Sequence, residues 1–331
     1  MSPSIPGVPT TVLVAPDSFK GTFTAAQVAR AIGQGLEAAG YPVDLCPVAD
    51  GGEGTLDALV PALGVAERVA PARDPFGRAI TAGYGLGAGV AVIETAAASG
   101  LGLVTVAERD AIAASTAGTG ELIIDAVAHG AQTIYLGVGG SATTDGGRGA
   151  IEAIKAGGGL GGARLVVLCD VRTPYEDAAR VFAPQKGADA EQVRRLTARL
   201  HAQARALPRD PRGEPMTGAA GGLSGGLWAA FGAELVSGAA FVLDAVGFDA
   251  RMRAARAVVC GEGRIDSQSL TGKAVSEVAT RARQAGVPCH AIVAVDELDR
   301  FGQRILDLQT VREARSRQGL RAAGRALAAD L

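Results

Sequence analysis

Short β-branched apolar runs alternate with longer helical patterns along this sequence, and this alternation limits the possible folds. Strands that alternate with helices form largely parallel sheets, because each crossover helix packs back onto the sheet. We expect strands at Thr11–Ala15, Val43–Val48, Val90–Glu94, Thr133–Val138, Arg164–Cys169, Ala240–Leu243, Ala257–Cys260 and His290–Val295. We expect helices at Thr24–Ala39, Thr55–Leu63, Gly120–His129, Gly147–Ala156, Ala190–Ala206 and Gly272–Ala285. The sequence therefore predicts the α/β class.

Length and composition limit what such a chain can be. A chain of 331 residues forms one large domain or two ordinary ones, because single cores stop growing near ~250–300 residues. The net charge of −2 argues against a basic nucleic-acid binder. No apolar run approaches the ~18–20 residues that span a bilayer, and residues 1–10 lack the features of a signal peptide. We expect a soluble, cytoplasmic protein that binds neither nucleic acid nor membrane, with reduced cysteines.

Carboxylates follow six of the expected strands, usually beside a glycine. They are Asp17, Asp50, Glu94, Asp145, Asp170 and Glu262. Asp and Gly are also common in turns, but in open α/β sheets ligands bind beyond the carboxyl ends of the strands. The repetition favours a polar active site over turn chemistry alone.

The run Val138–Gly147 is the strongest local signal, since a strand here enters a loop rich in glycine and hydroxyl groups and then a helix. Free backbone N–H groups, hydroxyls and a helix N-terminus are the parts of a phosphate cradle. Asp145 could hold Mg²⁺ there. The alternative is a Ser/Asp-capped helix after a glycine turn. A similar helix start at Thr119 and Gly120 is either a second anion site or simple capping.

Familiar catalytic motifs are absent. Gly272-Lys273 fails the Walker A spacing, protein-kinase and nucleophile-elbow signatures are missing, and the three histidines are scattered. Lysine is scarce, because only Lys20, Lys155, Lys186 and Lys273 stand among the 32 basic residues. A lysine retained where arginine dominates indicates a use for a compact ammonium. We favour a function for Lys20 and Lys273, leave Lys186 open, and regard Lys155 as solvated.

Seven motifs, in order, resemble those of bacterial glycerate kinases. They are Ala15–Gly21, Pro47–Gly54, Glu94–Leu101, Gly137–Gly147, Pro184–Ala188, Gly222–Gly226 and Gly261–Ser267. The resemblance implies phosphorylation of D-glycerate with ATP and Mg²⁺. We expect the protein to be a monomer or homodimer. It also implies two α/β domains with an active-site cleft between them. One is Rossmann or restriction-endonuclease-like and built from residues 1–73 and 287–331, and the other is flavodoxin-like and covers 74–286.

One departure from the family pattern concerns the segment after the helix Gly147–Ala156. The family usually carries an insertion of a few dozen residues there, which in this chain is reduced to Gly157–Gly162. The effect on oligomeric state and substrate affinity is open. Leu207–Gly222, rich in Pro, Arg and Gly, is expected to be a loop or mobile lid.

The logic of phosphoryl transfer then assigns candidate roles. The catalytic candidates are Lys20, Asp17, Asp50, Asp145 and Asp266. The substrate-binding candidates are Ser18, Glu53, Glu94, Ser99, Arg264 and Lys273, with Arg264 expected to bind the glycerate carboxylate. The nucleotide-binding candidates are Gly139, Gly140, Ser141, Thr143, Thr119 and Gly120, and the metal candidates are Asp145, Asp266 and Glu262.

Two rival functions remain compatible with these residues. One is a non-catalytic sensor of a small acid or nucleotide, which the number of carboxylates disfavours because they would repel an anion. The other is a kinase for a different sugar acid. The 2-hydroxyl of glycerate is favoured over the 3-hydroxyl as acceptor, although family members differ in this respect.

Overall fold

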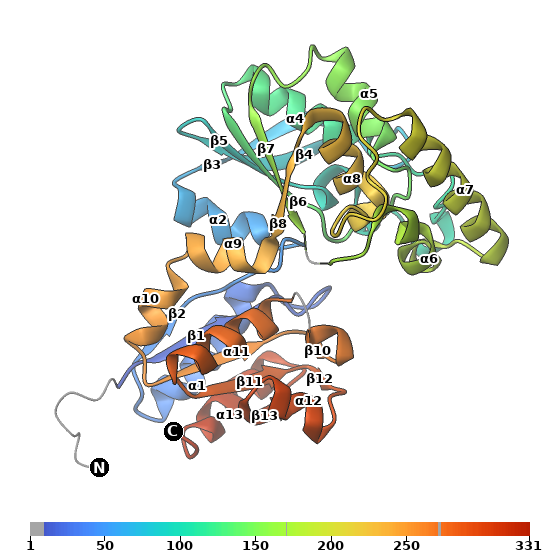
Figure 1. Ribbon diagram of the computed structural model, residues 1–331. Helices are drawn as coiled ribbons and strands as arrows, with labels where there is room; N and C mark the ends of the chain where they lie inside the picture. Colours follow the sequence, from blue (N-terminus) through green and yellow to red (C-terminus); the bar gives the residue numbers. More distant parts are fainter. Residues whose placement is uncertain (1–9, 170, 271–272) are drawn as a thin grey trace. The chain divides into compact units, whose positions relative to one another are not determined.

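The computed structural model describes residues 10–169, 171–270 and 273–331 (Figure 1). Asp170 and Gly272, a predicted strand-end carboxylate and a predicted helix start, lie outside the described residues. Contacts divide the chain into two compact units. The terminal unit comprises Met1–Asp50 and Ala239–Leu331, and the central unit comprises Gly51–Gly238.

The terminal unit contains a five-stranded parallel sheet with the strand order β13-β11-β9-β1-β2. Its strands are β1 (Val12–Pro16), β2 (Val43–Leu45), β9 (Ala257–Gly261), β11 (Cys289–Val293) and β13 (Leu308–Glu313). Numbered along this unit alone, the order is 2-1-3-4-5, which is that of flavodoxin-like sheets. The flavodoxin-type order thus lies in the terminal unit, whereas we expected it in the central one.

Helices cover both faces of this sheet (Figure 1). On one face α1 (Ala25–Ala38) packs against α13 (Arg317–Leu327). The two helices can approach closely because Gly35 has no side chain; a Cβ there would lie 2.1 Å from the Arg321 carbonyl oxygen. Thr24 caps α1 with a capping box, as its sequence predicts. α11 (Ala274–Ala285) packs on the strands β9, β1 and β11. The remaining elements are α9 (Gly238–Ala245), α10 (Phe248–Arg253), α12 (Arg300–Ile305), the 3-10 helix Ser267–Leu270 and the paired strands β10 (Arg264–Ile265) and β12 (Val295–Asp296).

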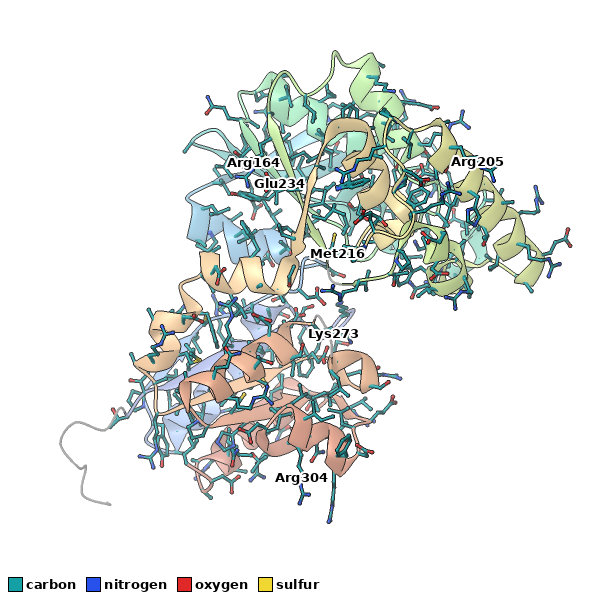
Figure 2. The ribbon with its side chains drawn as sticks, viewed as in Figure 1. Arg164, Arg205, Met216, Glu234, Lys273 and Arg304 are labelled. Carbon is teal, nitrogen blue, oxygen red and sulfur yellow. The ribbon has the colours of Figure 1, made fainter. Side chains whose placement is uncertain are left out.

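The central unit contains a mixed six-stranded sheet with the order β3-β4-β5-β6-β7-β8. Its strands are β3 (Ala66–Arg73), β4 (Ala79–Gly87), β5 (Val90–Glu94), β6 (Thr133–Gly137), β7 (Arg164–Cys169) and β8 (Glu234–Ser237). The pairs β3/β4 and β4/β5 are antiparallel, and the others are parallel. Arg164 on β7 donates two hydrogen bonds, of 2.8 and 2.6 Å, to the Glu234 carboxylate on β8 (Figure 2).

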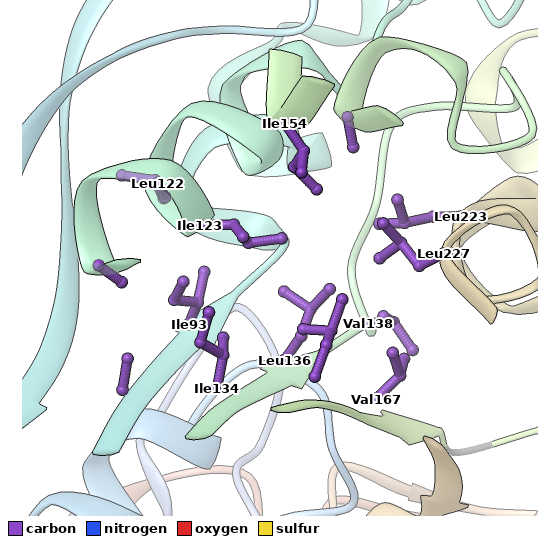
Figure 3. Packing of buried hydrophobic residues seen from close by; sticks show 14 of the residues in the cluster. Ile93, Leu122, Ile123, Ile134, Leu136, Val138, Ile154, Val167, Leu223 and Leu227 are labelled. Atoms are coloured by element: carbon purple, nitrogen blue, oxygen red, sulfur yellow. The ribbon is translucent and has the colours of Figure 1, made fainter. Parts of the chain in front are cut away.

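The core of the central unit lies between this sheet and three helices (Figure 3). Side chains such as Leu136 and Val167 from the strands meet Ile123, Ile154 and Leu223 from the helices. These helices are α4 (Ala117–Ala128), α5 (Arg148–Ala156) and α8 (Ala219–Phe231). The others are α2 (Thr55–Leu63), α3 (Ala96–Ser99), α6 (Ala178–Phe182), α7 (Ala190–Ala206) and the 3-10 helices Leu101–Leu103, Val106–Glu108, Tyr175–Asp177 and Pro184–Lys186.

The α/β class is confirmed, and several details differ from the sequence-based expectations. Ala240–Leu243 belongs to helix α9, because a four-residue apolar run does not by itself distinguish a buried strand from a helix. The chain crosses between the units at residues 50/51 and 238/239, compared with the expected 73/74 and 286/287. The reason is strand pairing, since β3 pairs with β4 in the central sheet and β9 pairs with β1 in the terminal sheet.

The two unusual segments also take definite forms. Gly157–Gly162 is a turn between α5 and β7 in which four of the five glycines have positive φ. Most of Leu207–Gly222 is irregular as expected, but α8 begins at Ala219 and includes the left-handed residues 220–222. Within the part of the chain that the structure describes, no helix is both long and apolar enough to cross a membrane.

Candidate functional site

Three buried carboxylates lie at the carboxyl ends of strands in the terminal unit. Asp17 follows β1, Glu262 follows β9, and Asp50 ends the segment after β2; they are 3%, 7% and 1% exposed. The loops after β1 and β9 are adjacent, because the Asp17 amide donates to the Gly261 carbonyl at 2.8 Å. The strand-end positions predicted for these carboxylates are therefore confirmed.

Burial and mutual repulsion make this carboxylate group unfavourable when fully ionised. The pKa of Asp17 is raised well above its ordinary value, first by burial and then by the charge of Asp50, with a smaller contribution from Glu262. Burial also raises the pKa of Glu262, which Lys273 partly offsets. The Glu262 Oε1 atom is buried without a hydrogen-bond partner. Such a group is stabilised by any cation that joins it.

Both lysines favoured by the sequence face these carboxylates. Lys20 Nζ lies 3.5 Å from Asp50 Oδ2, and the Lys20 side chain is 55% exposed. Lys273 precedes α11, and its Nζ lies 3.4 Å from Glu262 Oε2 (labelled in Figure 2). The terminal unit thus brings together the ammonium groups and carboxylates that phosphoryl transfer uses.

Three further candidates in this unit occupy different surroundings. Arg264, on β10, pairs with Glu297 at 3.1 Å, and its side chain is 59% exposed. Asp266 accepts a hydrogen bond from the Ser269 amide at 3.2 Å, and its own amide donates to Ser269 Oγ. Ser18 Oγ is buried without a hydrogen-bond partner next to Asp17. Arg264 is therefore the candidate most open to an incoming carboxylate.

The glycine loop after β6 in the central unit is held by close backbone contacts. A Cβ on Gly139 would lie 2.4 Å from the Gly52 Cα, so only glycine fits there without a shift. Gly140 has a left-handed φ of 71° and is exposed to solvent. Next to it Ser141 is 6% exposed, and Thr143 Oγ1 is buried without a hydrogen-bond partner. The loop therefore has the shape and the free hydroxyl of the predicted cradle.

The side chain of Lys186 binds to this loop. Its sequence context did not decide between a functional lysine and a solvated charge. It ends the 3-10 helix Pro184–Lys186 and is 2% exposed. Its Nζ donates to Ser141 Oγ at 3.0 Å and to the Thr143 carbonyl at 2.5 Å. Burial lowers its pKa to about 7, partly opposed by the charge of Asp145. Two sequence signals pointed to it, the scarcity of lysine and its place in the motif Pro184–Ala188.

Asp145 has a structural role that its sequence motif did not reveal. Its Oδ2 accepts hydrogen bonds from the amide and hydroxyl of Thr116, both at 2.9 Å, and from the Gly149 amide at 3.1 Å. Its Oδ1 accepts from the Gly147 amide at 3.0 Å. Asp145 thereby joins the N-terminal ends of α4 and α5 and occupies amides that a phosphate would otherwise use.

The remaining central candidates are largely taken up by packing. Ser99 Oγ and Thr119 Oγ1 are fully buried and bond to each other at 2.8 Å. A Cβ on Gly120 would lie 2.6 Å from the Ala150 carbonyl oxygen, so this glycine permits the contact of α4 with α5. Glu94 caps α2 by accepting from the Gly54 and Leu56 amides at 2.9 and 2.8 Å, and burial raises its pKa.

Three observations concern where a ligand or metal ion would bind. Glu53 is exposed at the start of α2. Among the described side chains, no three His, Cys, Asp or Glu residues are placed to hold one metal ion. A cavity of about 510 Å³ lies between α5 and α7 of the central unit, lined by residues such as Arg148, Tyr175 and Arg199, and none of the predicted site residues lines it.

Comparisons with known proteins place these motifs in a family. The model of the glycerate kinase family matches residues 12–158 and 155–311. The chain belongs to the glycerate kinase family. It is 41% identical to a glycerate kinase of Halalkalibacterium halodurans, over 85% of this chain and 84% of that protein. It is 39% identical to the glycerate 2-kinase of Escherichia coli K12, over 84% and 83% of the two chains.

A solved glycerate kinase structure agrees with the fold. A crystal structure assigned to glycerate kinase 2 of Salmonella typhimurium LT2 is 34% identical, with a TM-score of 0.80 over 97% of this chain and 98% of that one. The two blocks of the family match meet at residues 155–158, where α5 ends and the glycine turn begins. The resemblance to glycerate kinases that the sequence motifs indicate is therefore confirmed, and the chain is a kinase.

Proposed function

We propose that this member of the glycerate kinase family transfers the terminal phosphoryl group of ATP to the 2-hydroxyl of D-glycerate. The observation that carries the proposal is the cluster at the carboxyl ends of the terminal sheet. There Lys20 and Lys273 lie beside the buried carboxylates Asp50 and Glu262. Phosphoryl transfer requires cations on the moving phosphate and carboxylates that hold metal or orient the attacking hydroxyl.

In this proposal Mg²⁺ is held by carboxylates of the terminal unit. The raised pKa of Asp17 and the unpartnered Oε1 of Glu262 fit a site that a divalent cation would stabilise. Mg²⁺ needs only one or two carboxylates besides phosphate oxygens and water, so one or two of Asp17, Asp50 and Glu262 would suffice. Asp266 could assist. Asp145 does not fit this role, because both of its oxygens already accept backbone hydrogen bonds.

The substrates would be held by the remaining polar groups. The guanidinium of Arg264 presents a fork to the glycerate carboxylate, and Lys20 neutralises charge on the transferred phosphoryl group. Ser18 adds a hydroxyl next to Asp17. Gly139, Gly140, Ser141 and Thr143 would cradle phosphate oxygens of the nucleotide.

A coupled assay of ADP release with a panel of C3–C6 sugar acids tests the activity. We expect turnover with ATP, Mg²⁺ and D-glycerate, and a much lower kcat/KM with longer acids. Turnover that prefers another acid would indicate a different sugar-acid kinase. Binding without turnover of any acid would indicate a sensor.

The position of phosphorylation needs a separate measurement. The name of the E. coli relative, glycerate 2-kinase, supports the 2-hydroxyl. The phosphorus–proton coupling in an NMR spectrum of the product distinguishes a phosphate on a CH from one on a CH₂ group. Coupling to the CH₂ protons would overturn this part of the proposal.

We further propose a cytoplasmic location. All four cysteines, Cys46, Cys169, Cys260 and Cys289, are buried free thiols. This state is typical of proteins in a reducing compartment.

A further inference from the structure

We propose that Lys186, Ser141 and Thr143 form a binding site for a phosphoryl oxyanion in the central unit. The anion would be a phosphate of the nucleotide or of the phosphorylated product, and in this respect the inference rests on the proposed function. The residues come from the 3-10 helix Pro184–Lys186 and the glycine loop after β6.

The first argument is the unbalanced charge of Lys186. Its ammonium group is buried, and its acceptors are a hydroxyl and a carbonyl, both neutral. No carboxylate of the described residues lies within ion-pair distance of it. Asp145, the carboxylate whose charge raises the pKa of Lys186, is already bonded to the amides of Gly147 and Gly149 and to Thr116. A buried cation without a counterion is costly, and an arriving anion would remove that cost.

The second argument is the unused hydrogen-bonding capacity at this position. An ammonium group has three N–H donors, and Lys186 uses two of them. Thr143 Oγ1 is fully buried and has no partner. A buried polar atom without a partner is unfavourable unless a ligand satisfies it. The third N–H group and the threonine hydroxyl are the donors that phosphate oxygens require.

The third argument is access from solvent. Gly140 is exposed and directly precedes Ser141, whose hydroxyl lies 3.0 Å from Lys186 Nζ. An anion that reaches the loop at Gly140 therefore lies one residue from the hydroxyl that contacts the ammonium. Gly140 also has no side chain that would block the approach.

The backbone around Lys186 is fixed without its side chain, which makes a substitution informative. The Lys186 amide donates to the Ala183 carbonyl, and Arg109 donates to the Gln185 carbonyl at 3.1 Å. Gly187 has a φ of 91° and lies so close to Arg109 that a Cβ would be 2.8 Å from its carbonyl oxygen. We therefore expect the segment to keep its conformation when the ammonium is replaced.

Lys186→Met is the main test, with Lys155→Met as the matched control. Lys155 is an exposed lysine on α5 of the same unit, so both variants lose one positive charge. Calorimetry would measure the binding of ADP, inorganic phosphate, 2-phosphoglycerate and D-glycerate, and a thermal melt without ligand would measure stability. We expect Lys186→Met to lose at least tenfold in affinity for a phosphate-bearing ligand, to bind D-glycerate normally, and to melt no lower than wild type.

The two possible sources of the anion give different results. Weaker binding of ADP alone assigns the site to the nucleotide, and weaker binding of 2-phosphoglycerate alone assigns it to the product. Unchanged affinity for ADP, inorganic phosphate and 2-phosphoglycerate overturns the inference. A lower melting temperature of Lys186→Met shows a structural role and also overturns it.

Thr143→Val provides a second, independent variant. It keeps the shape of the side chain and removes a hydroxyl that has no partner in the protein. We expect weaker phosphate binding with an unchanged melting temperature; unchanged binding would contradict the role of Thr143. These binding measurements remain valid even if the wild type does not phosphorylate D-glycerate, so the inference and the proposed function fail separately.

Discussion

Lys20 is the residue whose charge bears most directly on turnover. Its Nζ lies 3.5 Å from the buried Asp50 carboxylate, and more than half of its side chain is exposed to an incoming substrate. We expect Lys20→Ala to lower kcat by about 100- to 1,000-fold, because a cation that meets developing charge has an effect of this size. The kinase assay measures this. Lys155→Ala serves as control, and turnover near the wild-type value in a folded Lys20→Ala variant would exclude the role.

Asp17 predicts a pH dependence of stability. The pKa of Asp17 in the folded protein is raised above its ordinary value. At pH values between the ordinary pKa and the folded pKa, the native state therefore binds more protons than the unfolded state. Stability therefore falls as pH rises through this window. Asp17→Asn should remove that slope and raise the free energy of unfolding at neutral pH, because the amide carries no charge that burial and Asp50 disfavour. Urea unfolding from pH 4 to 8 in EDTA measures both effects, and an unchanged slope would contradict the assignment.

At the scale of elements, Asp145 joins two helices. It accepts four hydrogen bonds at the starts of α4 and α5, three of them from backbone amides. Asp145→Ala should lower the free energy of unfolding by about 3 kcal/mol or more, because buried donors lose a charged acceptor. Asp145→Asn should lose less. Chemical denaturation measures this, and a Mg²⁺ requirement that shifts while stability stays constant would indicate a metal ligand instead.

The loop after β6 depends on the absence of a side chain at Gly139. A Cβ there would lie 2.4 Å from the Gly52 Cα. We expect Gly139→Ala to cost about 1–3 kcal/mol of stability, as is usual for overpacking, and to weaken nucleotide binding. Gly102→Ala is the matched control, because nothing lies within 4 Å of its added Cβ. Equal melting temperatures for the two variants would show that the loop adapts freely.

The sequence predicted the ends of buried strands well, but it did not predict strands that lack a continuous apolar run. Buried parallel strands such as Ala257–Gly261 are continuous apolar runs, so Glu262 could be placed correctly at a strand end. Strand β3 was missed because it contains Pro71 and is mostly exposed, which is tolerated at the edge of a sheet. Asp145 shows another limit, because Asp before two glycines fits a metal ligand and a helix cap equally well.

At the scale of the whole molecule, the division into units could not be read from local signals. Residues 51–73 and 239–286 belong to their units through strand pairing with distant parts of the chain. The resemblance to glycerate kinases had implied a flavodoxin-like central unit, whereas the strand order 2-1-3-4-5 occurs in the terminal one. Pairing partners over such separations leave no mark on composition or periodicity, whereas the glycerate kinase motifs are contiguous and were found.

The strands β1 and β9 are neighbours in the terminal sheet, but the whole central unit lies between them in the sequence. This arrangement affects how the protein folds during synthesis. Val12 pairs with Ala257, so β1 cannot gain this neighbour until most of the chain has left the ribosome. At about 5–20 residues per second, the delay is on the order of tens of seconds. During that time one edge of β1 is unpaired, which is a known cause of misassociation, while residues 51–238 can already form their sheet. Because the terminal unit contains residues from both ends of the chain, its sheet cannot be completed until its last strands have been synthesised.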